Sequence, residues 1–372
     1  MLRIEKRLTP SRAATYLVPV ASFILSLMTG AVLLIFVGAD PFETYKAMFM
    51  GAFWGKYPIS ETMVKAIPIM LCGLAVSIAF RMLFWNIGAE GQLALGGIAA
   101  AWVALFWADK MPAPMVLPAM TVAGFLAGAL WGAFSAVLKA FIGVNEIVTT
   151  LMMNYIAILW VEHLFYGPWK DPKGYGFPGT AEFPKFAWLP RLPGTRVHLG
   201  LAFALLAAFF LWLVLARTKW GYEIRVIGEN LKAARYAGIS LVRNMLLVML
   251  LSGGIAGLAG LAEVAGIAHR LQKGLTVGYG YTAIIVAWLA RLNPWVILPV
   301  GVLWAALLVG GDQIQIVMGL PAAVAGILQG LTLLFVLGGD FFTRYRVRWV
   351  RKVRLEAVAP ARATGGGTWE KR

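Results

Sequence analysis

The feature that most constrains this chain is a series of long, uncharged apolar stretches that recur along nearly its whole length. Only 13% of its 372 residues are charged, against about 25% in an average soluble domain. So few charges cannot cover a water-facing surface, and we therefore expect an integral membrane protein. The first stretch, residues 13–39, is longer than the roughly 7–15 apolar residues of a signal peptide, which indicates a retained helix.

Ten apolar stretches can be interpreted as membrane spans, because a helix needs about 20 apolar residues to cross the bilayer. We predict an all-α fold, a polytopic membrane helix bundle of about ten transmembrane helices. Residues 15–343 would form the transmembrane domain, between an N-terminal arm (1–14) and a basic tail (344–372). The expected spans lie near residues 17–39, 66–84, 87–107, 115–138, 145–165, 197–216, 244–267, 278–290, 294–311 and 319–338.

Lysines and arginines gather in the N-terminal arm, in the polar segment 217–243 and in the tail. Cytoplasmic loops retain basic residues, so we predict that these three regions and both termini are cytoplasmic. The net charge of +16 then reflects membrane topology, and no nucleic-acid partner is expected. Residues 167–197 are rich in proline and glycine and would form an irregular extracytoplasmic loop, although they also carry five basic residues.

Two regions, residues 66–104 and 247–290, are loosely alike in having a span rich in small residues, a polar break and a glycine-rich start of a new helix. In the predicted topology they run in opposite directions, which suggests an inverted repeat. Glycines spaced by four residues predict close contacts between helices. They are Gly124, Gly128 and Gly132, then Gly253 and Gly257, then Gly326 and Gly330.

Sequence patterns that would make the chain an enzyme are missing. The phosphate-binding pattern Gly-x-x-x-x-Gly-Lys-Ser/Thr does not occur, so the chain should not hydrolyse ATP itself. There is no His-Glu-x-x-His, the three histidines are far apart, and Cys72 is the only cysteine. We therefore expect no catalytic residues, no metal site and no cofactor.

Polar residues inside the apolar stretches are the candidates for a substrate pathway, since charged groups in a membrane are costly and often functional. Glu90 is the foremost, because glycines on both sides loosen the helix there, as in transporters with broken helices. The alternative is that Glu90 only fixes the packing of helices. The full set of pathway candidates is Asn86, Glu90, Gln92, Asn154, Tyr279 and Tyr281.

Segment 217–243 is the candidate for contact with a partner protein. It predicts a short helix that is capped by Asn230 and ends at Gly238. A small flat face of alanines on such a helix suits docking into a groove of another protein. The alternative is an ordinary connecting helix. The coupling candidates are Gly228, Asn230, Ala233, Ala234, Ala237 and Gly238.

At these segments the sequence resembles a known family. Asn-Ile-Gly-Ala-Glu-Gly-Gln at 86–92 and Gly-Val-Asn-Glu-Ile-Val-Thr-Thr-Leu-Met-Met-Asn-Tyr at 143–155 closely resemble permeases of ABC importers for nucleosides and simple sugars. Residues 228–239 resemble the cytoplasmic coupling loop of that group. Tyr-Gly-Tyr-Thr-Ala-Ile at 279–284 and Ala-Arg-Leu-Asn-Pro at 290–294 also match it.

The resemblance implies a multi-pass protein of the cytoplasmic membrane that works by alternating access. It implies three protein partners, namely an ABC ATP-binding subunit, a second permease subunit and an extracytoplasmic substrate-binding protein, besides membrane lipid. The Asn145–Glu146 motif is closest to the nucleoside branch. Ribose, galactose and branched-chain amino acid permeases are the alternatives within the superfamily, and an ion-coupled secondary transporter is the alternative outside it.

Overall fold

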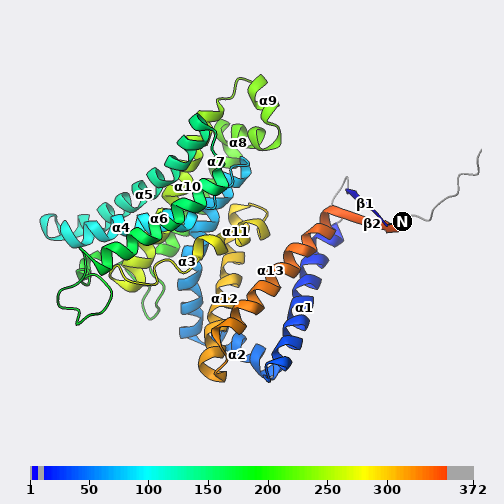
Figure 1. Ribbon diagram of the computed structural model, residues 1–372, viewed down its shortest axis with the longest axis horizontal. Coiled ribbons are helices and arrows are strands. Elements are labelled where there is room, and N and C mark those ends of the chain that lie inside the picture. The colour runs from blue at the N-terminus through cyan, green and yellow to red at the C-terminus, as the bar shows by residue number, and fades with distance from the viewer. Residues whose placement is uncertain (1, 7–11, 350–372) are drawn as a thin grey trace, which may run out of the picture.

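A computed structural model describes residues 2–6 and 12–349, and its architecture is a bundle of helices (Figure 1). The long helices are α1 (Arg12–Phe36), α2 (Pro41–Phe53), α3 (Lys56–Arg81), α4 (Ala89–Phe106), α5 (Ala113–Val137), α6 (Glu146–Tyr166), α7 (Gly200–Arg217), α8 (Lys219–Glu229), α10 (Leu241–Glu263), α11 (Tyr279–Leu289), α12 (Pro294–Met318) and α13 (Ala322–Arg344). The short elements are α9 (Leu231–Tyr236), η1 (Ala108–Lys110), η2 (Leu138–Ile142), η3 (Lys185–Ala187) and η4 (Val264–Ala268).

All ten predicted spans are helical, but they do not all have the length of a span. Among the described residues, eight helices are long and apolar enough to cross a membrane, or nine if the bent pair α1–α2 counts as one span. The pair bends by 117° because a break at residues 37–40 separates the two helices. The predicted span near 278–290 forms α11, which has only 11 residues because residues 269–278 are irregular.

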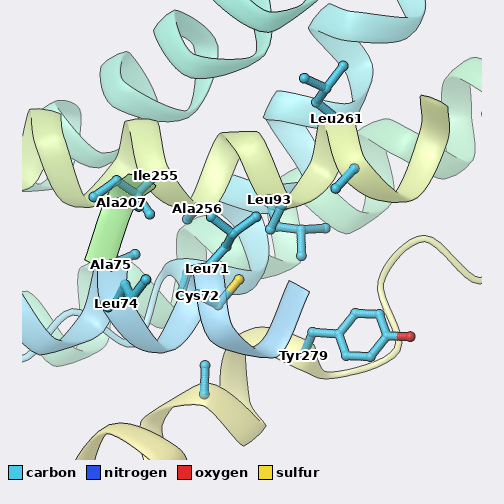
Figure 2. Close-up of a cluster of buried hydrophobic side chains, with 14 of the residues drawn as sticks. Leu71, Cys72, Leu74, Ala75, Leu93, Ala207, Ile255, Ala256, Leu261 and Tyr279 are labelled. Atoms are coloured by element: carbon cyan, nitrogen blue, oxygen red, sulfur yellow. The ribbon is translucent and has the colours of Figure 1, made fainter. Parts of the chain in front are cut away.

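Helix α3 lies at the centre of the bundle, packed against α7, α10, α11 and α12. A helix that is apolar on all sides is expected in such a buried position. From Ala66 to Phe80 every residue of α3 is buried. Figure 2 shows part of this core, where Leu71 and Ala75 of α3 lie beside Ile255 and Ala256 of α10. The only cysteine, Cys72, is fully buried in the same cluster.

Glycines bring α5 and α10 into backbone contact. A Cβ atom added at Gly128 would collide with the carbonyl oxygen of Gly253, and one added at Gly257 with that of Gly124. Two of the predicted glycine contacts are therefore confirmed. The third is wrong within this chain, because nothing lies within 4 Å of a Cβ added at Gly326 or Gly330 on α13.

The two ends of the described chain meet in a small antiparallel sheet of β1 (Leu2–Lys6) and β2 (Tyr345–Trp349), in which Leu2 pairs with Trp349. Apolar and charged residues alternate along both segments, which is the pattern of a strand. The sequence-based topology predicts an arm and a basic tail at these positions and no strands. The rest of the predicted tail, residues 350–372, lies outside the described residues.

Helix α8 packs at the end of α3, close to the start of α12. Arg81 at the end of α3 donates hydrogen bonds to the carbonyl oxygen of Leu292, and Gly228 of α8 packs on the Arg81 backbone. Helix α12 starts at this end and runs to α2, where its Gln313 contacts Gly51. Helix α13 then runs beside α1 to the β1–β2 pair (Figure 1).

Candidate functional site

The polar break between α3 and α4 places Glu90 where two helices begin. Glu90 lies in the first turn of α4 and is 1% exposed. Its carboxylate accepts hydrogen bonds from the backbone N–H of Gly278 (2.8 Å) and of Gly280 (2.6 Å) at the start of α11. Helix N-termini favour negative charge, so two helices stabilise one buried carboxylate.

Glycine at position 280 makes this approach possible. A Cβ atom there would collide with the backbone nitrogen of Glu90, so the first turns of α4 and α11 touch through their main chains. Helices α4 and α11 are the two helices that follow the breaks at 82–88 and 269–278. The two members of the suggested inverted repeat therefore meet at Glu90.

Beside Glu90, side-chain amides form a buried network. Asn86 and Gln92 exchange two hydrogen bonds of 3.1 Å, and Asn86 also donates to the hydroxyl of Ser252 on α10 (3.0 Å). Ser252 in turn donates to the carbonyl oxygen of Ala75 on α3 (2.6 Å). Sequence analysis missed Ser252, whose only signal was a hydroxyl directly before the glycine pair of an apolar helix.

Asn154 links the network to α6. Its side-chain oxygen accepts from the N–H of Gly91 (2.8 Å), while its amide donates to the carbonyl of Ile87 (2.9 Å) and to the hydroxyl of Tyr281 (3.1 Å). Tyr281 is only half-buried, whereas Asn154 is fully buried. The network thus reaches a partly open surface through Tyr281.

Within the described residues, Tyr279 is the one pathway candidate that makes no hydrogen bond to this group. It lies at the start of α11 and is 8% exposed. Figure 2 shows its ring pointing away from the α3 cluster. The structure therefore brings all six candidates to one joint between α4, α6 and α11, with five of them hydrogen-bonded there.

A helix cap stabilises the start of α6. Asn145 is the N-cap residue, and its side-chain oxygen accepts from the N–H groups of Ile147 and Val148. Glu146 in the first turn forms an ion pair of 2.8 Å with Lys139. The acid thus has a structural role at this end of α6, where a negative charge also suits the helix dipole.

Segment 217–243, which holds the coupling candidates, contains α8 and α9. These two helices project from one end of the bundle (Figure 1). Asn230 caps α9 as predicted, by accepting from the N–H groups of Lys232 and Ala233. Gly238 has a φ of +73°, a conformation that favours glycine after a helix end.

The prediction of one flat face of alanines is wrong for Ala234. That side chain is fully buried, whereas Ala233 and Ala237 are exposed. Tyr236, 93% exposed, is the largest side chain that α9 presents outwards. The mistake arose because Ala234 lies one position from Ala233 on the helix and therefore about 100° around it.

The opposite end of the bundle is covered by residues 167–199, which fold over the end of α10. The N–H groups of Phe183 and Thr180 donate to the carbonyls of His269 and Leu271. His269 stacks on Trp188, with ring centroids 3.8 Å apart. Among the described residues no three His, Cys, Asp or Glu side chains lie close enough to bind a metal ion.

Comparison with known proteins places this geometry in a family. Residues 59–337 match the family described as branched-chain amino acid transport system / permease component. The glucose ABC transporter permease protein of Haloferax volcanii is 37% identical over 98% of this chain and 99% of that protein. The guanosine ABC transporter permease protein of Bacillus subtilis is 35% identical over 91% and 96%. A nucleoside ABC transporter permease protein of Lactococcus lactis is 28% identical over 78% and 81%.

Proposed function

The chain belongs to the family of permease components of branched-chain amino acid transport systems, and we propose that it moves nucleosides inward as the permease of an ATP-driven importer. It is a multi-pass membrane protein. Two relatives whose names specify guanosine or nucleosides support the choice of solute, one of them along 96% of its length. The joint at Glu90 supports the transport role, because broken helices that meet within a bundle are a common transporter design.

A simple sugar is the second candidate solute. The glucose permease of Haloferax volcanii aligns with almost the entire chain. Nucleosides and sugars share a ring that carries several hydroxyl groups, so one permease scaffold suits both. The two candidates differ in the base, which only a nucleoside carries.

The proposed partners follow from what this chain lacks and what it exposes. It has no phosphate-binding loop, so ATP hydrolysis is assigned to a separate ABC ATP-binding subunit. Helices α8 and α9 would be the cytoplasmic contact for that subunit, with Tyr236 outermost. A second permease subunit would complete the pore, and a substrate-binding protein would dock on residues 167–199 at the opposite end.

Uptake by the assembled importer in liposomes tests this function. We expect radiolabelled guanosine to enter only when ATP reaches the ATP-binding subunit and the binding protein is present, and to enter equally with a protonophore. Glucose uptake under the same conditions, without guanosine uptake, would select the second candidate. Uptake that ignores ATP and stops with the protonophore would identify an ion-coupled transporter and reject the proposal.

A further inference from the structure

A cavity of about 460 Å³ lies at the outer end of α10, beside the loop that covers it. This volume falls within the roughly 300–1,000 Å³ of small-molecule sites. Three segments line it, namely the covering loop, the end of α10 with η4, and the irregular residues before α11. The lining residues that matter here are Phe177, Glu263, Ile267, Arg270, Gln272 and Leu275.

Glu263 is the unusual member of this lining. It is the last residue of α10, lies within a helix long enough to span the membrane, and is 8% exposed. Its Oε1 has no hydrogen-bond partner among the described residues. A buried polar atom without a partner destabilises a fold, and a charged one more so. Glu90 by contrast has two backbone donors, so of these two buried acids it is Glu263, a lining residue of the cavity, that keeps an unpartnered acceptor.

The rest of the lining combines the aromatic ring of Phe177 with polar residues that already have partners in the protein. The guanidinium of Arg270 lies 5.6 Å from the ring centroid of Phe177 and 4.0 Å from the carboxylate of Glu182. Gln272 is bridged through its backbone to Gly179, which leaves its side-chain amide to line the cavity. Because Glu182 balances Arg270, the cavity favours a neutral solute with hydroxyl groups over an anion.

The cavity also lies against the helix that carries Glu90, α4. Its lining residues Val264 and Leu275 pack against Gly97 of α4. Gly97 follows Glu90 by seven residues, which is two helical turns or about 10 Å along α4. The cavity and the Glu90 joint therefore lie about two helical turns apart on the same helix.

We propose that this cavity is an outer subsite for a neutral, hydroxyl-rich solute, in which Glu263 accepts hydrogen bonds from the solute hydroxyls and Phe177 covers its ring. The solute class, nucleoside or simple sugar, rests on the proposed function. The subsite itself rests on the cavity and on the unsatisfied carboxylate.

Cysteine protection tests the subsite without depending on transport. In membrane vesicles that hold the assembled importer, Gln272→Cys places a thiol in the cavity, and Lys273→Cys places one on the exposed neighbour outside it. The natural Cys72 is fully buried and gives a silent background. Guanosine at ten times its dissociation constant should slow maleimide labelling of Gln272→Cys about tenfold, and leave Lys273→Cys unchanged.

Adding Glu263→Gln should abolish this protection, because the amide replaces one acceptor oxygen by a donor. Glu162→Gln is the matched control, since Glu162 lies on the outer half of α6 and does not line the cavity. If Glu263→Gln prevents assembly, Phe177→Ala in the exposed loop gives the same test and should also weaken protection.

The outcomes separate the subsite from the proposed function. ATP-driven guanosine uptake with no protection of Gln272→Cys would overturn the subsite and leave the function intact. If only glucose is taken up, glucose becomes the probe, and protection by glucose that requires Glu263 supports the subsite although the nucleoside assignment fails. Protection by neither solute, or protection that survives Glu263→Gln, overturns it.

Discussion

At the level of single residues, Glu90 joins two helix N-termini, and its substitution should weaken that joint. In Glu90→Gln the amide offers one acceptor oxygen to the two N–H groups of Gly278 and Gly280. Loss of one charge-assisted hydrogen bond should lower the free energy of unfolding by about 1.5–3 kcal/mol. Thermal unfolding in lipid nanodiscs measures this, with Glu162→Gln as control. Equal unfolding temperatures for the two variants would contradict a structural role for the Glu90 carboxylate.

The same variant distinguishes the two interpretations of Glu90 that the sequence left open. If Glu90 only holds α11 on α4, uptake per folded transporter should change little once stability is corrected. If it also contacts solute, the KM for uptake should rise.

A second residue-level prediction concerns His198, which is buried beside α7 and outside the spans. Burial, with Arg191 and His269 nearby, lowers its pKa from 6.5 to about 4. The unfolded chain therefore binds a proton more readily than the folded chain. The contribution of His198 to the free energy of unfolding is fully present above pH 6.5 and falls as the pH drops towards 4, by at most about 1.4 kcal/mol per pH unit.

His198→Asn keeps an acceptor for the N–H of Gly200 and should remove this acid sensitivity. Unfolding temperatures at pH 7 and pH 4.5 give the comparison, and an unchanged acid sensitivity would exclude His198 as its source.

The sequence predicted which polar residues form the joint at Glu90, but not which groups they bind. Polar residues inside apolar stretches led to Asn86, Gln92 and Asn154, because such groups must find partners in a membrane. The partners themselves came from residues distant in the chain, such as Ser252 on α10 and the backbone of Gly278. No local pattern reveals which backbone N–H a carboxylate will meet, so the role of Glu90 as a cap for α11 could not be predicted.

At the level of elements, glycine contacts should decide whether helices pack. In Gly128→Ala the added methyl group would collide with the backbone of Gly253, which should separate α5 from α10 and lower the unfolding temperature. Gly326→Ala is the matched control, because nothing lies within 4 Å there. It should be neutral or stabilising by up to about 1 kcal/mol from helix propensity. Similar losses in both variants would mean that α13 also packs through its glycines, against another chain.

Helix α8 offers a second test at this scale. Gly228 packs directly on the carbonyl oxygen of Arg81 at the end of α3. Gly228→Ala should push α8 away from α3 and so weaken the link between the ATP-binding subunit and the bundle. We expect ATP hydrolysis to persist while the number of solute molecules taken up per ATP falls severalfold. An unchanged ratio would show that α8 does not transmit the motion.

Element lengths show where sequence patterns reach their limit. Hydropathy left out α2 and started the span of α3 near residue 66 instead of Lys56, whereas it placed α11 closely, near 278–290. The irregular residues 269–278 before it are held by the covering loop, through Thr180 and Phe183. Contacts between distant segments therefore hold the residues before this helix, whose start the sequence predicts to within one residue. The predicted helix contact at the glycines of α13 is wrong because glycine spacing alone cannot distinguish a packed helix face from an open one.

For the whole molecule, α9 and the covering loop lie at opposite ends of the bundle, and we expect these ends to face opposite sides of the membrane. Tyr236 on α9 and Tyr175 in the covering loop are both almost fully exposed, and they belong to these two ends. Tyr236→Cys and Tyr175→Cys are therefore a matched pair for labelling with a membrane-impermeant maleimide on intact cells or spheroplasts. The basic residues around α8 and α9 predict that this end is cytoplasmic.

We expect Tyr175→Cys to be labelled from outside and Tyr236→Cys only after permeabilisation. The loop around Tyr175 is itself basic, so the charge rule alone does not assign it, whereas the structure ties it to the end opposite α8. Labelling of Tyr236→Cys alone from outside would invert the topology, and labelling of both thiols from outside would contradict the placement of α9 in the cytoplasm. It would also remove the contact proposed for the ATP-binding subunit, because ATP is hydrolysed in the cytoplasm and a helix on the other side could not receive its motion.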